Sequence, residues 1–459
     1  MDLDRALELA RAGRAQAEQD FIEELRIPSV STLPEHRADV RRNAEWLRAR
    51  MEKLGMRTEL TDVLEGGHPV LLGEWMGLPG APTLTIYGHY DVQPADPLEE
   101  WDTPPFEPVL RDGLIYARGS SDNKGNHLPA LKAAEYAFAA GGPPLNLRFL
   151  IEGEEEIGGP SLPAYLKQRA GQLKSDYTLI WDGGTANDGR PVIVTGLRGI
   201  LYVEIHADGA SVDLHSGGFG GVAPNPINTI ARLLGELKDR DGRVTIPGFY
   251  DGVEDPDADE SADWDRTTGY EENVKQIIGA AVLEGESDYP AIERASSRPT
   301  LDVNGIIGGF TGEGTKTVIP RHVMAKVSMR LVPGQDPSRI LETLKEYVGE
   351  LTTPGVRVEV RELGFFAKPV TLGYKHKAAR SAEAAFEEAF GVAAVRRRMG
   401  GSVPVTSDFQ EHVGGEIVCS GLAQPGSGAH GPNEKMSLDN FHRGTEMLLR
   451  YMDRLARAE

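Results

Sequence analysis

Apolar runs that alternate with helical patterns over roughly the first 180 residues are the feature that most constrains this fold. Residues 69–75, 83–88 and 145–151 are predicted strands, because each is a run of apolar or β-branched side chains bounded by turn residues. Small apolar side chains recur at helical spacing over residues 126–140. Strands that alternate with helices predict an α/β domain with a mostly parallel central sheet flanked by helices.

The α/β pattern brackets a segment of different character. Helices are predicted over 4–25 and 40–54 and, near the other end, over 375–390 and 438–457, with a strand near 416–419. Between these parts, residues 201–206 alternate like a half-exposed strand. A helix at 226–238, strands at 323–332 and 356–362, and a helix at 337–351 follow. We therefore predict an inserted α+β domain.

At 459 residues the chain is too long for one ordinary core, which agrees with two domains. One predicted domain is discontinuous, 1–195 with 367–459, and the inserted domain is 196–366. Two parts are predicted to be loops. Residues 95–108 are rich in proline and acid, and residues 250–298 are acidic and form the most irregular part of the chain.

Charge and cysteine content exclude several classes of function. Lys and Arg number 49 against 70 Asp and Glu, a net charge of −21, so neither nucleic acid nor an anionic membrane would be attracted. Cys419 is the single cysteine, which excludes a disulfide framework and a cysteine zinc finger. Neither a signal-peptide core nor a membrane-spanning run is present. We expect a soluble, cytoplasmic protein.

His89 and Asp91 follow the predicted strand 83–88 directly. Side chains two apart in an extended segment point the same way, so the Asp91 carboxylate can accept one ring N–H of His89 and leave the other nitrogen for a metal. A His-X-Asp sequence at a strand end is more often structural, and its meaning depends on what else in the chain could join it.

Four further polar features occur at predicted loops near strand ends, where ligands bind in open α/β sheets. They are Asp122 in a Gly-Ser loop, the run Glu154-Glu155-Glu156, Asp182 after a strand, and His430 in a glycine-rich loop. Each has a simpler alternative: a helix N-cap, a solvated acidic turn, a plain turn and a structural histidine. Together, two histidines and several carboxylates suit two divalent ions such as zinc or manganese.

These motifs resemble the two-metal peptidase family of carnosinases, cytosolic non-specific dipeptidases, carboxypeptidase G-type enzymes, aminoacylases and succinyl-diaminopimelate desuccinylases. The resemblance covers nearly the whole chain. Residues 213–217 (Asp-Leu-His-Ser-Gly), 315–320 (Thr-Lys-Thr-Val-Ile-Pro) and 330–333 (Arg-Leu-Val-Pro) are most similar to the carnosinase and non-specific dipeptidase branch.

The resemblance implies a division of roles among the metal-site residues. His89, Asp122 and Asp182 would hold one ion, and Asp122, Glu156 and His430 the other, with Asp122 as the bridge and Asp91 orienting His89. The family spacing Glu-Glu-X-Gly favours Glu155 as general base and Glu156 as ligand, while the extra Glu154 departs from that pattern. The resemblance also implies a cis peptide between Asp122 and Asn123.

The same resemblance implies residues that hold the substrate. His215 would reach the site of a partner subunit in a homodimer and stabilise the oxyanion, whereas its alternative is a loop histidine packed at the interface. Arg330 and Thr317 would grip the free carboxylate, and Gly401 and Ser402 would contribute a main-chain and a hydroxyl contact. The resemblance thus makes 1–195 with 367–459 a catalytic metal-binding domain and 196–366 a lid and dimerisation domain. The helix and strand edge of the inserted domain would form the dimer interface.

We therefore predict a metallopeptidase that hydrolyses dipeptides or short peptide amides with two divalent ions, zinc or manganese. An alternative within the same family is an N-acyl amino acid deacylase or carbamoyl hydrolase. A metal-lined binding module without turnover would lack a base, and Glu155 argues against it. A two-metal phosphoesterase uses similar ligands, but the −21 charge disfavours polyanions.

Overall fold

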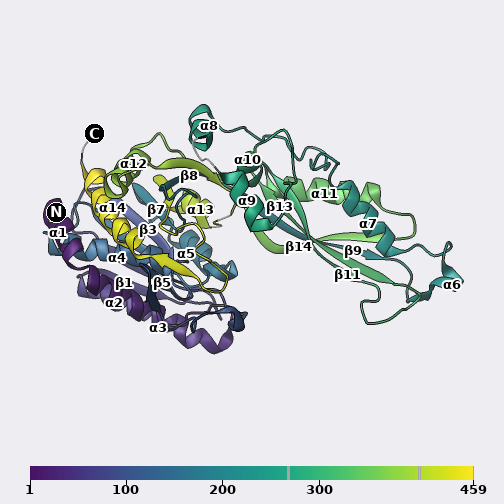
Figure 1. Cartoon of the computed structure of the whole chain (residues 1–459), viewed down its shortest axis with the longest axis horizontal. Helices are drawn as coiled ribbons and strands as arrows, with labels where there is room; N and C mark the ends of the chain where they lie inside the picture. The colour runs from purple at the N-terminus through teal and green to yellow at the C-terminus, as the bar shows by residue number, and fades with distance from the viewer. Residues whose placement is uncertain (266–268, 402, 404, 458–459) are drawn as a thin grey trace.

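The computed structural model describes residues 1–457 except 266–268, 402 and 404. Its elements form two lobes (Figure 1). The larger lobe contains a nine-stranded sheet and both chain termini, and the smaller lobe contains a four-stranded sheet. The predicted class, an α/β domain with a flanked central sheet plus a smaller α+β part, is confirmed.

The large sheet has a parallel centre and antiparallel flanks. Its strands are β1 (Arg57–Thr61), β2 (Val70–Trp75), β3 (Thr83–His89), β6 (Asn146–Glu152), β7 (Tyr177–Trp181), β8 (Val192–Leu197), β15 (Val370–Thr371), β16 (Val395–Met399) and β17 (Glu416–Ser420). Their order is β1-β2-β6-β3-β7-β17-β8-β15, and β16 also pairs with β8. The run β6-β3-β7-β17 is parallel throughout, so the carboxyl ends of these strands lie at one edge.

Helices cover both faces of this sheet. They are α1 (Leu3–Ala12), α2 (Arg14–Leu25), α3 (Arg37–Lys53), α4 (Lys124–Ala139), α5 (Ser161–Arg169), α12 (Lys377–Phe390), α13 (Val405–Asp408) and α14 (Leu438–Ala456). Leu84 and Ile86 of β3 pack in the cluster under α4 and α14, while Tyr87 packs on the opposite face with α5 and α13. Burial on both faces explains the unbroken apolar runs from which the strands were predicted.

One predicted helix is in fact two. The single helix expected over 4–25 breaks at Gly13, between α1 and α2. A Cβ at this position would lie 2.4 Å from the hydroxyl oxygen of Tyr136 on α4, so only glycine lets the chain approach that helix. The prediction was wrong here because a close tertiary approach, which leaves no trace in apolar periodicity, decides where the helix ends.

The small lobe is built around the antiparallel sheet β11-β13-β9-β14. Its strands are β9 (Gly199–Asp208), β10 (Leu214–His215), β11 (Thr300–Gly308), β12 (Val318–Ile319), β13 (His322–Leu331) and β14 (Arg357–Ala367), and its helices include α6 (Ser216–Phe219), α7 (Pro226–Glu236) and α11 (Pro337–Leu351). Leu233 of α7 and Leu344 of α11 are buried against Val203 and Val327 of the sheet. Alternate side chains of β9 and β13 are therefore buried, as period two requires.

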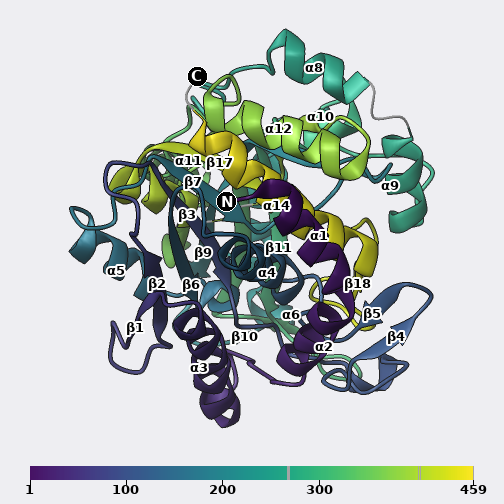
Figure 2. The same cartoon turned by 90° about the vertical axis from the view of Figure 1, so that its left-hand side faces the viewer.

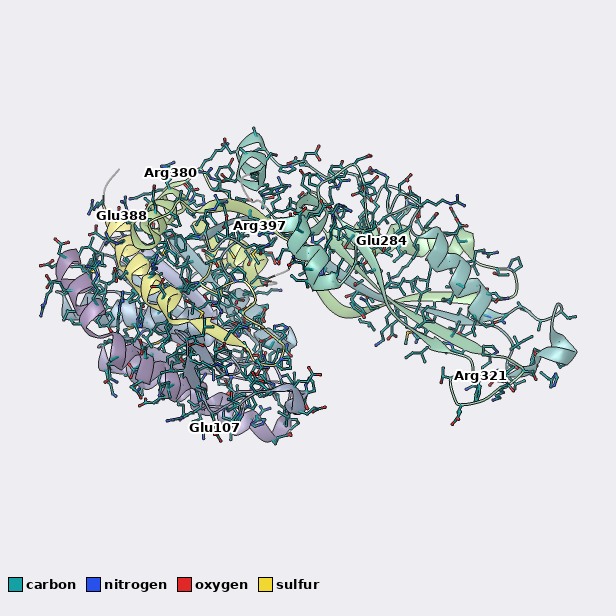
Figure 3. All side chains as sticks on the ribbon, in the orientation of Figure 1. Glu107, Glu284, Arg321, Arg380, Glu388 and Arg397 are labelled. Carbon is teal, nitrogen blue, oxygen red and sulfur yellow. The ribbon has the colours of Figure 1, made fainter. Side chains whose placement is uncertain are left out.

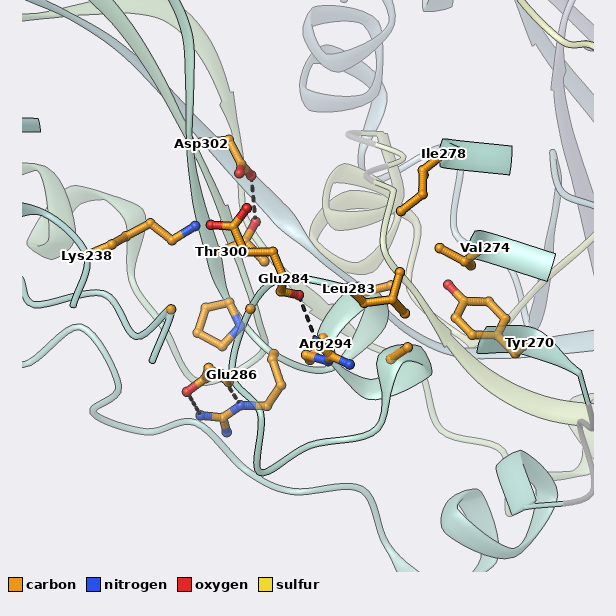
Figure 4. Close-up of a pocket in the computed structure, with 16 residues that line it drawn as sticks. Lys238, Tyr270, Val274, Ile278, Leu283, Glu284, Glu286, Arg294, Thr300 and Asp302 are labelled. Atoms are coloured by element: carbon orange, nitrogen blue, oxygen red, sulfur yellow. Dashed lines mark hydrogen bonds and ion pairs between the residues drawn. The ribbon is translucent and has the colours of Figure 1, made fainter. Parts of the chain in front are cut away.

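The stretch 250–298, predicted to be irregular, contains three short helices: α8 (Ala258–Asp265), α9 (Tyr270–Ile278) and α10 (Ala291–Ser296). Tyr270, Val274 and Ile278 of α9 form an apolar wall of a cavity of about 310 Å³ (Figure 4). Arg397 of β16, labelled in Figure 3, places its guanidinium carbon 5.1 Å from the centre of the Tyr270 ring. This stretch thus contacts the large lobe through a cation–π pair.

The chain crosses between the lobes at two points. Strand β8 ends at Leu197 in the large sheet and β9 begins at Gly199 in the small one, while β14 ends at Ala367 and β15 returns to the large sheet at Val370. The division into a domain of residues 1–195 with 367–459 and a domain of residues 196–366 stays a proposal. The large lobe also contains a small three-stranded sheet, which consists of β4 (Val109–Arg111), β5 (Leu114–Tyr116) and β18 (Lys435–Ser437).

No helix among the described residues is long and apolar enough to cross a membrane.

Candidate metal centre

The polar residues predicted after separate strands meet at one edge of the large sheet. His89 is the last residue of β3, Glu155 and Glu156 follow β6, and Asp182 follows β7. These three strands are neighbours in the sheet (Figure 2), and their carboxyl ends lie together because they run parallel. Asp122 lies in the loop before α4, and His430 lies in the loop before β18.

The first group that could hold a metal consists of His89, Asp122 and Asp182. Nε2 of His89 lies 3.1 Å from Oδ1 of Asp122 and 3.7 Å from Oδ1 of Asp182. The imidazole of His89 is fully buried, whereas the two carboxylates are partly exposed. One nitrogen from the end of β3 and two carboxylate oxygens from separate loops converge here.

The second group consists of Asp122, Glu156 and His430. Nε2 of His430 lies 3.0 Å from Oδ2 of Asp122 and 3.3 Å from Oε2 of Glu156. The two oxygens of Asp122 therefore face different groups, Oδ1 toward His89 and Oδ2 toward His430. This is the arrangement that a carboxylate shared by two cations requires.

Two backbone features mark these loops. The peptide bond between Asp122 and Asn123 is cis, as the family resemblance implied. His430 has φ of 64°, in the left-handed region that non-glycine residues seldom adopt. Non-glycine residues in such conformations concentrate at functional sites, where the surrounding structure holds them in place.

The three consecutive glutamates lie in three different surroundings. The carboxylate of the buried Glu154 accepts the backbone N–H of His68 at 2.6 Å and that of Ser161 at 3.1 Å. Glu156 belongs to the second group, and Glu155 lines a cavity of about 660 Å³ beside it. Glu154 is thus turned away from the metal groups, and the roles of Glu155 as base and Glu156 as ligand stay predictions.

Asp91 contacts both sides of the site. Its carboxylate lies 3.4 Å from Nδ1 of His89 and accepts the backbone N–H groups of Glu155 at 3.3 Å and Glu156 at 3.1 Å. Nδ1 of His89 also lies 3.1 Å from the backbone oxygen of Asp91. Both contacts leave Nε2 of His89 facing the metal group, so the orienting contact predicted for Asp91 is present.

Asn123 and Gln93 support the ligands and were missed by the sequence analysis. The amide of Asn123 donates to Oδ1 of Asp182 at 2.7 Å, and that of Gln93 donates to Oε2 of Glu156 at 2.8 Å. Such partners orient metal ligands. The position of Asn123 beside Asp122 was a usable signal, whereas nothing in the pattern around Gln93 pointed to it.

Burial and crowding perturb the titration of these groups. Burial raises the pKa of the Glu155 carboxyl well above its ordinary value, and the nearby Asp182 and Glu156 carboxylates act in the same direction. Hydrogen bonding to Asp122 and Glu156 raises the pKa of His430 to about 10. Carboxylates crowded in this way repel one another unless a cation is present, and a divalent ion fits that requirement.

A pH-dependent stability effect is expected at Glu152, the last residue of β6. Burial, aided by Asp91, raises the pKa of its carboxyl from 4.5 to about 8. Because the folded state then holds a proton that the unfolded state has lost, the metal-free protein becomes less stable as pH rises between these values. In wild type the hydroxyl of Tyr87 donates to Oε1 of Glu152 at 2.8 Å. Glu152→Gln removes the titrating group and with it this loss of stability, while the side-chain carbonyl of the glutamine can still accept from Tyr87.

We therefore expect thermal unfolding in the presence of a chelator to show a higher midpoint for Glu152→Gln, with a larger gain at pH 8.5 than at pH 5.5. A gain of equal size at both values would contradict the assigned pKa.

His215 lies far from the metal groups of its own chain. It ends β10 and directly precedes α6, which occupies the end of the small lobe away from the large sheet (Figure 1). The backbone N–H of Arg321, labelled at that same end in Figure 3, donates to Asp213 at 2.9 Å. Nδ1 of His215 accepts the N–H of Gly217 at 2.9 Å, and its side chain is exposed. A role in catalysis would need a second copy of the chain.

Arg330 and Thr317, predicted to act together, are separated within one chain. Arg330 pairs with Ile200 at the end of β13 that is next to the large lobe. Thr317 lies at the opposite end of the small lobe, where its backbone oxygen accepts the N–H of Ser216 at 3.0 Å. The ten residues of β13 lie between the two ends, a span of about 30 Å. Arg330 is half-buried, and burial lowers the pKa of its guanidinium. A single chain therefore cannot bring both to one substrate carboxylate.

Of the predicted substrate contacts from the large lobe, Gly401 is exposed and has open space where a Cβ would lie. Ser402 lies outside the described residues.

Two groups of possible metal ligands share an aspartate at the carboxyl ends of parallel strands, and this arrangement fits one class of protein, the metal-dependent hydrolases. The donors are nitrogen and oxygen, which suit hard or borderline ions, and the buried Cys419 is not among them.

The chain belongs to peptidase family M20/M25/M40, whose model matches residues 85–454. The Cys-Gly metallodipeptidase dug1 of Schizosaccharomyces pombe is 31% identical over 481 residues, which cover 99% of each chain. Beta-Ala-His dipeptidase of Homo sapiens is 30% identical over 449 residues, covering 93% of this chain and 87% of that protein. The structure of an M20 family metallo-carboxypeptidase, Sso-CP2 from Sulfolobus solfataricus, superposes with a TM-score of 0.85 at 31% identity over 96% of this chain and 99% of that one.

The predicted family is thus confirmed, together with its dipeptidase and carnosinase branch. The protein is an enzyme, a metallopeptidase that depends on divalent metal.

Proposed function

We propose that this enzyme hydrolyses dipeptides with a pair of divalent ions, zinc or manganese. The observation that carries the proposal is the shared Asp122, whose two carboxylate oxygens face separate groups that each contain a histidine and a second carboxylate. Relatives that are about 30% identical over nearly the whole chain and are named Cys-Gly and Beta-Ala-His dipeptidases support the substrate class.

His89, Asp122 and Asp182 would hold one ion, and Asp122, Glu156 and His430 the other. Ions bound in this way supply a Lewis acid for the scissile carbonyl and make water acidic enough to lose a proton near neutral pH. Buried Asn123 and partly exposed Gln93 hold two of the ligand carboxylates in place through the amide contacts described above.

Glu155 would be the proton carrier. Its carboxylate takes a proton from the attacking water and returns it to the nitrogen of the leaving amine. The carboxylate of Asp91 accepts the backbone N–H of Glu155 at 3.3 Å and so fixes the position of the main chain from which the Glu155 side chain extends. The adjoining cavity, lined also by Lys368 and Asp408, offers space for the part of the substrate nearest the base.

Arg330 would bind the free carboxylate of the substrate. Its guanidinium is half-buried at the end of β13 beside the crossing to the large lobe, where a two-pronged pair with a carboxylate is shielded from water. Gly401 and Ser402 are proposed to add a main-chain and a hydroxyl contact from the large lobe.

A homodimer would complete the site. Strand β11 is an edge of the small sheet and exposes Val303, Ile306 and Ile307, the last with 64% of its surface accessible. An apolar edge strand of this kind favours pairing with another chain. We propose that a partner copy covers this edge, near α7, and brings its His215 to the oxyanion and its Thr317 to the carboxylate end of the substrate.

Metal removal tests the proposed chemistry. We expect treatment with a chelator followed by its removal to lower dipeptide hydrolysis at least about a hundredfold, because the ions supply several kcal/mol of transition-state stabilisation. Added zinc or manganese should restore the activity. Cys-Gly and β-Ala-His are the first substrates to assay, with metal content measured in parallel. Full activity in a demonstrably metal-free sample would contradict the proposal.

A carboxypeptidase acting on longer peptides is a second candidate, favoured by the likeness to the metallo-carboxypeptidase Sso-CP2 at 31% identity. The N-acyl amino acid deacylase considered from the sequence would use the same metal groups. A panel of dipeptides, tetrapeptides with free carboxyl ends and N-acyl amino acids at equal concentration separates the three. Preference for dipeptides by kcat/KM supports the main proposal. The cytoplasmic location expected from the sequence also stays a prediction.

A further inference from the structure

Glu434 is a fully buried carboxylate at the end of the loop that carries His430, and it contacts the loop that carries Asp122. Its oxygens accept five hydrogen bonds, all from residues 118–122. Oε2 accepts from a terminal guanidinium N–H of Arg118 at 2.7 Å and from the backbone N–H of Gly119 at 2.8 Å. Oε1 accepts from the backbone and hydroxyl of Ser121, at 2.8 and 2.9 Å, and from the backbone N–H of Asp122 at 3.0 Å.

These contacts link the two metal groups through one side chain. Glu434 lies four positions after His430, and the loop it binds ends at the aspartate that both groups share. The buried Arg118 neutralises its charge and also donates to the backbone oxygen of Pro94 at 3.0 Å. The ion pair is therefore enclosed among three segments of the large lobe.

The direction of the contacts matters for Asp122. The backbone N–H of Asp122 is held by Glu434, and its side chain lies between Nε2 of His89 and Nε2 of His430. When the main chain of Asp122 is held in place, its carboxylate is held in position between the two histidines. Partners of metal ligands act in this way, and their loss commonly lowers metal affinity about 10- to 100-fold.

We propose that Glu434 is a positioning residue that aligns Asp122 as the carboxylate shared by two cations. This inference rests on the proposed metal site but names a residue outside it. Glu434 touches neither substrate nor metal in this role. It acts through the Arg118–Asp122 loop, and a role limited to stability would leave the metal affinity of the folded protein unchanged.

Glu434→Gln is the direct test. An amide keeps the shape, but whichever way it is turned its NH₂ group faces at least two donors, since each carboxylate oxygen accepts at least two hydrogen bonds. Titration calorimetry of chelator-treated protein with Mn²⁺ should show the Kd for the weaker-binding ion raised about 10- to 100-fold. Ser121→Ala, which removes only the hydroxyl contact, should raise it by a smaller factor, and this milder variant serves if Glu434→Gln does not fold.

Glu74→Gln is the matched control. Glu74 is also a buried carboxylate of the large lobe and accepts from Nε of Arg148 at 2.8 Å, but it is the next-to-last residue of β2 and belongs to neither metal group. Both glutamate variants should lower the thermal midpoint of the metal-free protein, and only Glu434→Gln should weaken Mn²⁺ binding. Unchanged Mn²⁺ affinity in both Glu434→Gln and Ser121→Ala would overturn the inference. A wild-type protein that binds neither Mn²⁺ nor Zn²⁺ would instead refute the proposed metal site.

Discussion

Glu155→Gln is expected to lower kcat for dipeptide hydrolysis by about 10²–10⁴-fold, the range that a positioned general base contributes. The substitution removes the carboxylate that accepts the proton of the attacking water, while the amide keeps nearly the same shape. Metal content should remain at the wild-type level, because Glu155 is in neither group of three ligands. The loss should therefore appear in kcat with metal retained.

The adjacent Glu154 provides the control for this prediction. Its carboxylate accepts backbone N–H groups of His68 and Ser161 and faces away from the metal groups. Glu154→Gln should therefore keep turnover within about tenfold of wild type and chiefly lower thermal stability, since a buried hydrogen bond to a charged group is worth about 1.5–3 kcal/mol. Comparable turnover in Glu155→Gln and wild type, with metal present, would rule out Glu155 as the base.

The distinction between Glu154, Glu155 and Glu156 shows how far the sequence could predict the site. Strand ends followed by polar residues indicated that His89, Asp182 and the run 154–156 could lie near one another, because parallel strands place their carboxyl ends at one edge. The structure brings together two groups of possible metal ligands, formed by His89, Asp122, Asp182, Glu156 and His430. Spacing alone could not show that Glu154 turns into the protein. That choice depends on two backbone N–H groups contributed by segments distant in the sequence.

Glu434 was not predicted at all, and the reason is physical. A glutamate near a glycine-rich loop is most often solvated, and nothing in the sequence indicates that Arg118, more than 300 residues earlier, will be buried against it. Full burial of a carboxylate is rare unless it is paired, so its significance becomes visible only when its partners are known.

The fold was predicted best where burial is periodic. Strands β3 and β6 and helices α4 and α14 lie close to the predicted ranges because their buried faces follow periods of two or 3.6 residues or are apolar throughout. Strand β11 escaped prediction because Asn304 and Gly305 interrupt its apolar pattern, where the pairing with β13 shifts register between Val303 and Gly305. The exposed Val303, Ile306 and Ile307 of this edge strand are the reason to propose that a second copy of the chain covers it.

Mixing two inactive variants in one dimer gives the sharpest test of whether His215 acts in the site of a partner subunit. His215→Ala and Glu155→Gln are each expected to be nearly inactive, the first through a lost oxyanion contact, which typically costs about 10²–10³-fold in kcat. If His215 acts in the partner's site, a mixed dimer contains one complete site: Glu155 from the His215→Ala subunit and His215 from the Glu155→Gln subunit. Random reassortment of the two inactive proteins should restore about a quarter of wild-type activity, because half of the dimers are mixed and each has one working site of two.

A histidine that acted within its own chain would give a different result, since each subunit of the mixed dimer would then carry one defect in its own site. Helix α6, which directly follows His215, lies at the end of the small lobe away from β3 and β7 (Figure 1), and this favours the exchange between subunits. The measurement is dipeptide hydrolysis after joint denaturation and refolding, or after co-expression, with each variant treated alone as the control. Activity no higher than that of the single variants, in a sample shown to contain mixed dimers, would place His215 outside the partner's site and leave the oxyanion without this donor.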